Sequence, residues 1–160
     1  MLVFEAKLSG TDEQYKRLDE AIRTARFVRN SCLRYWMDNR GEKVGRYQLN
    51  IYCAVLAKEF PWARKLNSMA RQASAERAWA AIARFYENCK KNIPGKKGFP
   101  KFKKYKTRDS VEYKTSGPKL SEDRRTINFM DGFKAGSFKM WGTRDLHFYQ
   151  LKQIKRVRVV

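Results

Sequence analysis

The sequence is poor in the residues that usually build catalytic and metal sites. Its 160 residues include one histidine, His147, and three cysteines, with no Cys-x-x-Cys pair. The glycine patterns Gly-x-Ser-x-Gly, Gly-x-Gly-x-x-Gly and Gly-x-x-x-x-Gly-Lys-Ser/Thr do not occur. These absences argue against a self-contained zinc site, a serine hydrolase and a phosphate-cradling loop. We therefore expect no metal and no cofactor.

Acidic residues are also scarce, at 16 Asp and Glu against 36 Lys and Arg, a net charge of +20. A metal-dependent nuclease needs carboxylates that converge on one ion, each held by a rigid element. We interpret His147 as a partly buried structural residue in a strand-like segment. The acids of the C-terminal half stand singly or in a turn, and we interpret them as solvated surface groups: Asp109, Glu112, Glu122, Asp123, Asp131 and Asp145. The sequence thus predicts a protein that is not an enzyme.

Long apolar runs are missing too. No stretch approaches the length of a membrane span, and the first residues lack a basic region followed by an apolar run. Cys32, Cys53 and Cys89 each fall in a helical-looking segment, so we expect buried, reduced thiols. We therefore expect a cytoplasmic, nucleoid-associated protein with no membrane partner.

Positive charge is what the sequence has in excess. At 42% hydrophobic and 14% aromatic residues, the chain is too apolar for a disordered basic tail, so its charge must lie on a folded body. Residues 1–90 carry 17 basic and 10 acidic residues, whereas residues 91–160 carry 19 and 6. The shorter part is the more basic, which favours a polyanionic partner that binds there.

The most basic segment, residues 90–106, is rich in lysine, has no acid and is interrupted by glycine and proline. This composition predicts a loop, and each cation that neutralises a phosphate releases a counterion. Phe99, Phe102 and Tyr105 either stack on unpaired bases or anchor the loop to the body of the protein. The predicted contacts to nucleic acid in this loop are Lys96, Lys97, Lys101, Lys103, Lys104, Tyr105 and Lys106.

Hydrophobic periodicity predicts an α+β fold, a small antiparallel β-barrel with an inserted three-helix lobe. Residues 1–10 are expected to form the first barrel strand, residues 11–91 the helical lobe and residues 92–110 the basic loop. Residues 111–160 are expected to supply the remaining strands, the last of them at 154–160. The first strand would return to pair with the later ones.

Three helices are predicted within the lobe. The first begins at a capping box of Thr11 and Gln14 and runs to about Asn39, and its apolar stripe includes Trp36. The second covers about residues 47–59, with Tyr47, Ile51 and Val55 on its apolar side. The third covers about residues 68–91 and is capped by Asn67 or Ser68. Its first turns carry side chains that could reach base edges in a groove, namely Ser68, Arg71 and Gln72.

Several of these motifs resemble one known family. The motifs that show this resemblance are Arg26-Phe27-Val28-Arg29-Asn30, Ser68-x-Ala70-x-Gln72, Trp79-x-x-Ile82-x-x-Phe85-Tyr86, and Lys97-Gly98-Phe99-Pro100-Lys101-Phe102-Lys103-Lys104 followed by Ser110-Val111-Glu112-Tyr113. In this order they are similar to the N-terminal part of TnpB, also called OrfB, the transposon-encoded RNA-guided DNA endonuclease related to type V CRISPR effectors. The likeness covers nearly all of the chain.

The resemblance implies a wedge-like β-barrel and a recognition lobe that grip a guide-type RNA and double-stranded DNA. It also implies readers of the short target-adjacent DNA motif at Tyr47, Ser68, Gln72 and Thr115. Ser68 departs from members that carry a basic residue there. Members of the family continue into a RuvC-like nuclease domain and a zinc ribbon, and the sequence shows neither.

Three functions follow as hypotheses. The first is a non-catalytic nucleic-acid-binding module of a transposon-associated RNA-guided protein. The second is one piece of a split endonuclease that acts with a separate RuvC-like polypeptide. The third is a general basic RNA-binding structural protein.

Overall fold

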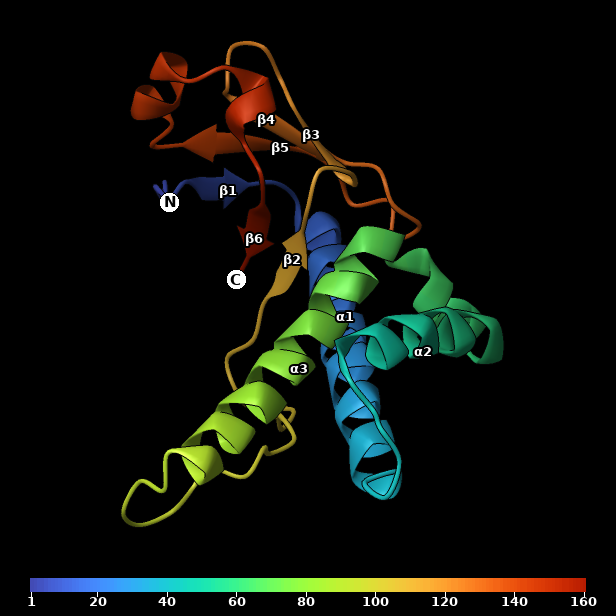
Figure 1. Cartoon of the computed structure of the whole chain (residues 1–160). Helices are drawn as coiled ribbons and strands as arrows, with labels where there is room; N and C mark the ends of the chain where they lie inside the picture. Colours follow the sequence, from blue (N-terminus) through green and yellow to red (C-terminus); the bar gives the residue numbers. More distant parts are fainter.

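Three long helices lie between a first short strand and five later strands, so the protein is α+β (Figure 1). The computed structural model describes residues 1–160. The helices are α1 (Asp12–Asp38), α2 (Arg46–Glu59) and α3 (Ser68–Lys90). The strands are β1 (Lys7–Ser9), β2 (Val111–Tyr113), β3 (Pro118–Leu120), β4 (Thr126–Phe129), β5 (Gly136–Trp141) and β6 (Val157–Val159). Short 3₁₀ helices occur at η1 (Pro61–Lys65), η2 (Arg144–Phe148) and η3 (Leu151–Gln153).

The predicted helix starts are confirmed by their caps. The Thr11 hydroxyl accepts a hydrogen bond from the Gln14 backbone N–H at 3.2 Å, and the Gln14 side chain accepts one from the Thr11 N–H at 3.0 Å. Asn67 caps α3 by accepting from the N–H groups of Met69 and Ala70. Each cap satisfies amides that have no partner inside the helix, which is why the helices begin where they do.

The first strand does return to the later ones. In the four-stranded sheet, in the order β1-β5-β4-β3, β1 pairs antiparallel with β5 and Leu8 lies opposite Met140. A second sheet joins β2 to β6, with Glu112 opposite Arg158. The three helices therefore form an insertion between two strands of one sheet, as the sequence predicted.

The predicted antiparallel β-barrel is not supported, because the structure has two separate sheets and no closed barrel. Hydrogen bonding ends at β1 and β3 in one sheet, and β2 and β6 form a sheet of their own. Closure needs a continuous hydrogen-bond ladder around the ring. Between β5 and β6 the chain forms the short helices η2 and η3 and no strand. The last strand, predicted at 154–160, covers only Val157–Val159. The first strand is also shorter than predicted, because residues 1–6 lie outside the sheet and are exposed.

Two hydrophobic cores meet along α1. The first packs the N-terminal half of α1 against the strands and contains Leu18, Ala21, Ala25, Leu66, Ala70, Val111, Tyr113, Ile127, Phe129, Phe133, Ala135, Phe138 and Val159. The second packs the C-terminal half of α1 against α2 and α3 and contains Val28, Cys32, Leu33, Trp36, Leu49, Cys53, Leu56, Ala75, Ala78 and Ile82. The helical lobe and the sheets thus share one long helix as their support.

Two predictions about the lobe need correction. The predicted apolar face of α2, with Tyr47, Ile51 and Val55, is exposed, and the buried positions are instead Leu49, Cys53, Leu56 and Ala57. Both sets follow helical spacing, so periodicity alone could not choose between them. Cys32 and Cys53 are buried free thiols, as expected, whereas Cys89 is exposed.

No helix of the structure is both long enough and apolar enough to cross a membrane.

We predict that Trp36→Ala lowers the free energy of unfolding by about 3–5 kcal/mol, the usual cost of removing a buried aromatic ring. The Trp36 residue is 1% exposed, and its indole N–H donates to the Tyr86 hydroxyl at 3.0 Å. The matched control is Trp141→Ala, because Trp141 is 63% exposed. Urea denaturation of both variants tests this, and equal losses would contradict the assignment of the helical core.

Candidate nucleic-acid interface

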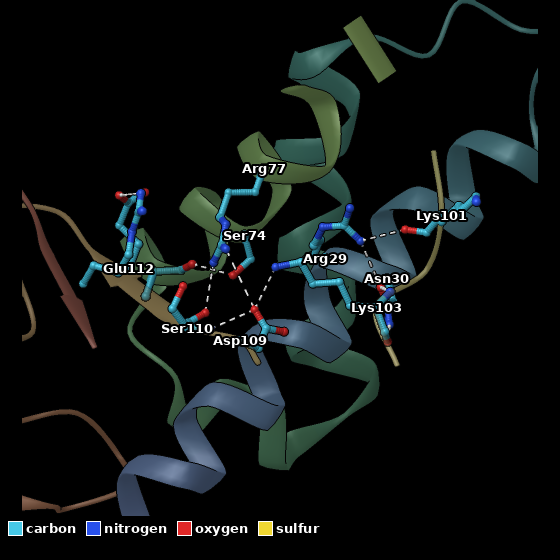
Figure 2. A network of polar contacts seen from close by, with 11 residues as sticks. Arg29, Asn30, Ser74, Arg77, Lys101, Lys103, Asp109, Ser110 and Glu112 are labelled. Atoms are coloured by element: carbon cyan, nitrogen blue, oxygen red, sulfur yellow. Dashed lines mark hydrogen bonds and ion pairs between the residues drawn. The ribbon is translucent and has the colours of Figure 1, made fainter. Parts of the chain in front are cut away.

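The basic loop, residues 92–110, has no helix or strand of its own, yet its backbone is held by α1. Asn30 donates from Nδ2 to the Lys103 carbonyl at 2.9 Å and accepts the Lys103 N–H at 3.0 Å. Arg29 donates to the Lys101 carbonyl at 3.2 Å (Figure 2). The Asn30 amide therefore pairs with the loop backbone much as a neighbouring strand would.

The direction of the loop follows from these contacts. Phe99 lies beside Trp36 near the C-terminal end of α1, and Tyr105 lies beside Arg26, three turns closer to its start. As residue numbers rise along the loop, they fall along α1. The loop is therefore laid antiparallel along one side of the helix.

Phe99 anchors the loop. Its ring lies 5.8 Å from the Trp36 ring and 5.1 Å from the Phe85 ring, in tilted and edge-on arrangements. The Arg40 guanidinium lies 5.6 Å from the Phe99 ring centroid. These contacts support the anchoring alternative for Phe99, although the residue is still 43% exposed.

Tyr105 is placed differently. The residue is 70% exposed, and the guanidinium groups of Arg23 and Arg26 lie 5.9 and 5.5 Å from its ring centroid. Arg26 also donates to the Tyr105 carbonyl at 3.2 Å. The backbone is fixed while the ring remains on the surface among cations, so Tyr105 retains the stacking role that the sequence allowed.

The interpretation of Asp109 as a solvated surface acid is wrong. Its side chain is 3% exposed, and its Oδ1 atom accepts from Lys103 Nζ at 3.0 Å and from the Ser110 N–H at 2.8 Å. Arg77 Nη2 lies 3.8 Å from the same oxygen. The network joins the end of the loop to α1 and α3 (Figure 2). The Asp109 carboxylate can be buried because the positive charges of Lys103 and Arg77 compensate its negative charge.

Two more acids depart from that interpretation. Glu112 is buried and accepts from Arg156 and Arg158 at 3.0 and 3.1 Å, which ties β2 to β6. Burial raises the pKa of Asp131, which accepts from the Tyr113 hydroxyl at 3.1 Å. Glu122, Asp123 and Asp145 are exposed, as predicted, and so is His147, which was expected to be partly buried. No three His, Cys, Asp or Glu side chains lie close enough together to hold one ion.

The lysines predicted in the loop divide into two groups. Lys97 donates from Nζ to the Ile93 carbonyl, and Lys103 pairs with Asp109, so both contribute to the fold. The side chains of Lys96, Lys101, Lys104 and Lys106 make no hydrogen bond or ion pair and are exposed. Figure 2 shows the Lys101 side chain directed away from the network around Asp109. These four ammonium groups are available to an anion.

Cations of α1, and of the turn that follows it, lie beside those of the loop. Arg23, Arg26 and Arg40 contact loop aromatics and are within ion-pair distance of no carboxylate. We call the following set the basic ridge: Arg23, Arg26, Arg40, Lys101, Lys104 and Lys106. Sequence analysis did not assign the three arginines or Asn30, although the Arg-Phe-Val-Arg-Asn motif marked their neighbourhood. The missing information was the direction in which the loop crosses the helix.

A second group of predicted residues gathers at the start of α3. Ser68 and Gln72 are exposed there, and Thr115 donates from its hydroxyl to Met69 Sδ at 3.5 Å. Arg71 differs from them, because its guanidinium donates to the carbonyls of Arg64 and Leu66, at 3.2 and 2.6 Å. Arg71 therefore closes the turn after η1.

Glu76 brings the remaining member of this group into place. Its Oε1 atom accepts from Lys114 Nζ at 2.6 Å and from Arg46 Nη2 at 3.1 Å. Tyr47 follows Arg46 and is exposed in the first turn of α2, and Thr115 follows Lys114. The Glu76 carboxylate, which is largely buried, thus connects α2, α3 and the end of β2. Burial raises the pKa of the Glu76 carboxyl. The hydrogen bonds from Lys114 and Arg46 outweigh this effect and hold the pKa below its usual value.

Comparison with protein-family models and with curated proteins finds no match to this chain. Two surface features make up the candidate interface. The first is the basic ridge along α1 and the loop. The second is a group of exposed side chains near the start of α3, Tyr47, Ser68, Gln72 and Thr115, which we call the reader cluster after the role that the sequence predicts for it.

We predict that Asn30→Ala frees the loop without unfolding the protein. Losing both bonds to the Lys103 backbone lowers the free energy of local opening by about 1–2 kcal/mol, since two partly buried backbone groups lose their partner. Limited trypsin digestion should then cut faster after Lys101 and Lys104. The control is Gln72→Ala, an exposed amide that does not touch the loop. An unchanged cleavage rate in Asn30→Ala would contradict the role of this asparagine.

We also predict a pH-dependent contribution from Glu76. Because its folded pKa lies below its usual value, its stabilisation is complete above the unfolded pKa of about 4.3 and is lost as pH falls through the folded value. The difference in unfolding free energy between wild type and Glu76→Gln is therefore expected to be largest near neutral pH and to shrink toward pH 3. Glu42→Gln is the control, because Glu42 is exposed and its side chain makes no ion pair. A difference that does not vary with pH would overturn the assignment.

Proposed function

We propose that this protein is a non-catalytic module that binds RNA and duplex DNA, chiefly through phosphates. The observation that supports it is the basic ridge, in which cations from two segments far apart in sequence share one side of α1 and no carboxylate neutralises them. Solubility does not require such an arrangement. A polyanion that lies along the helix would contact both segments together.

The dimensions of the ridge suit a nucleic-acid strand. From Arg23 to the end of α1 at Asp38 is roughly 23 Å at about 1.5 Å per helical residue. Along the axis of a duplex, one strand rises about 3.4 Å for each phosphate while it winds around that axis, so a path of this length can meet several phosphates. Because lysine and arginine contact phosphates without reading bases, the ridge would give affinity and the reader cluster would give sequence preference.

The reader cluster supports a duplex-binding role at the start of α3. An exposed amide at Gln72 and hydroxyls at Ser68 and Thr115 lie together at the end of a helix, where they could meet base edges in a groove. Tyr47 adds an exposed ring nearby. The likeness of the sequence motifs to TnpB leads us to propose an RNA-guided, transposon-associated setting for the module. The separate sheets would stand where that family has its wedge-like barrel.

We predict that replacing Lys96, Lys101, Lys104 and Lys106 by Ala weakens binding to every duplex sequence. If each lysine contacts one phosphate, the slope of log affinity against log salt becomes shallower by roughly 3 to 4. The thermal melt should barely move, because these exposed side chains make no internal bonds. Fluorescence anisotropy on a labelled duplex at several salt concentrations measures the slope.

The matched control removes the same charge elsewhere. Lys16, Lys43, Lys119 and Lys139 are exposed, make no ion pair and lie on four different segments, so their quadruple Ala variant also lowers net charge by four. We expect a clearly smaller change of slope in that variant. Equal changes in the two variants would mean that net charge alone, and no located surface, attracts nucleic acid.

A further inference from the structure

A surface cavity of about 300 Å³ lies between α1, η1 and the β4–β5 turn, residues 130–135. This volume is at the lower end of the range for small-ligand sites, which suits a single planar group. Three aromatic and three charged residues supply most of its lining, namely Phe27, Trp62, Phe133, Glu20, Arg23 and Lys65. Because Arg23 is also a member of the basic ridge, the cavity adjoins the ridge.

The Trp62 ring is held by other aromatic rings, yet much of it stays exposed. Its centroid lies 4.6 Å from the Phe27 ring and 5.6 Å from the Phe60 ring, both in tilted arrangements. The residue is nevertheless 45% exposed. Tilted neighbours fix the orientation of the indole without covering it as a parallel stack would. Trp62 is thus an oriented aromatic surface that a ligand can reach.

The wall of the cavity beside Trp62 is built by close packing of η1 against the β4–β5 turn. The Gly132 N–H donates to the Lys65 carbonyl at 2.8 Å, and a Cβ atom at Gly132 would lie only 2.7 Å from Lys65 Cα. The Arg17 guanidinium donates to the carbonyls of Phe133 and Lys134 at 3.4 and 3.3 Å. These contacts hold the wall in place without a ligand, so little ordering entropy would oppose binding there.

The charge around Trp62 favours an anionic ligand. Arg23 and Lys65 are exposed and lie within ion-pair distance of no carboxylate, whereas Glu20 is the only acid of the lining. Arg64, next to Lys65 in η1, adds another exposed cation. A ligand that joins a planar group to a negative charge suits an aromatic surface among cations. An unpaired nucleotide has this combination, with a base that can stack and a phosphate.

We propose that this cavity receives one unpaired base of a single strand that lies on the basic ridge. The base stacks on Trp62, and its phosphate meets Arg23 or Lys65. Bases inside a duplex are already stacked on one another, so the cavity adds affinity for single strands alone. Every base has a π-face, so the cavity distinguishes little among bases. This inference rests on the proposed function and adds to the ridge a preference for single strands.

Substitutions at Trp62 test the stacking role. We expect Trp62→Ala to weaken binding of labelled oligothymidine DNA roughly tenfold, within the range of one base–aromatic stack, and to leave binding of a labelled DNA duplex unchanged. Trp62→Phe keeps a ring and should retain most of the affinity. Trp141→Ala removes an exposed tryptophan on β5 and should change neither affinity. Fluorescence anisotropy with the full chain at one salt concentration measures all of these.

The outcomes separate the two proposals. An unchanged affinity of Trp62→Ala for oligothymidine, or an equal loss on the duplex, would overturn the base site while leaving phosphate binding intact. If the wild-type protein bound neither DNA, both proposals would be overturned.

An abasic strand controls for damage to the fold, because Trp62 also packs against Phe27 and Phe60. An abasic DNA oligonucleotide of the same length keeps every phosphate and lacks the group that stacks. We expect wild type and Trp62→Ala to bind this strand equally. A loss on the abasic strand as large as the loss on oligothymidine would mean that the substitution acts without any base, and would contradict the proposal.

Discussion

The structure depends on polar side chains of α1 that hold the backbone of a strongly cationic loop. Lysine ammonium groups repel one another, and a segment without acids, interrupted by glycine and proline, has little tendency to order itself. Asn30 and Arg29 supply the hydrogen bonds that strand pairing would otherwise give. Phe99 adds an aromatic anchor. Only because the backbone is fixed in this way do free cations of helix and loop form one ridge.

The same helix carries both hydrophobic cores, so the ridge is coupled to the whole fold. The N-terminal half of α1 packs against the strands and its C-terminal half against α2 and α3. Asp109 joins this support from the other end of the loop by pairing with Lys103 and facing Arg77 on α3. Binding on the ridge would therefore act on a rigid body, and little ordering entropy would oppose it.

Local signals in the sequence predicted much of this fold. The capping box at Thr11 and the Asn67 cap are encoded within a few residues, and the return of the first strand to the later ones followed from its isolation in the sequence. The absence of barrel closure, the buried face of α2 and the burial of Asp109 depend on contacts between distant segments. Composition located the basic loop correctly, but only the fold shows that Lys103 is neutralised by Asp109 while Arg23 and Arg26 have no carboxylate partner.

Lysine acetylation footprinting of the free and the RNA-bound protein tests the central claim most directly, because it reports which ammonium groups an anion covers. The account predicts that bound RNA strongly slows modification of Lys101, Lys104 and Lys106. Lys119 and Lys139, which lie on the four-stranded sheet, should react as in the free protein. Equal protection of lysines on the ridge and on the sheet would contradict a located phosphate-binding surface.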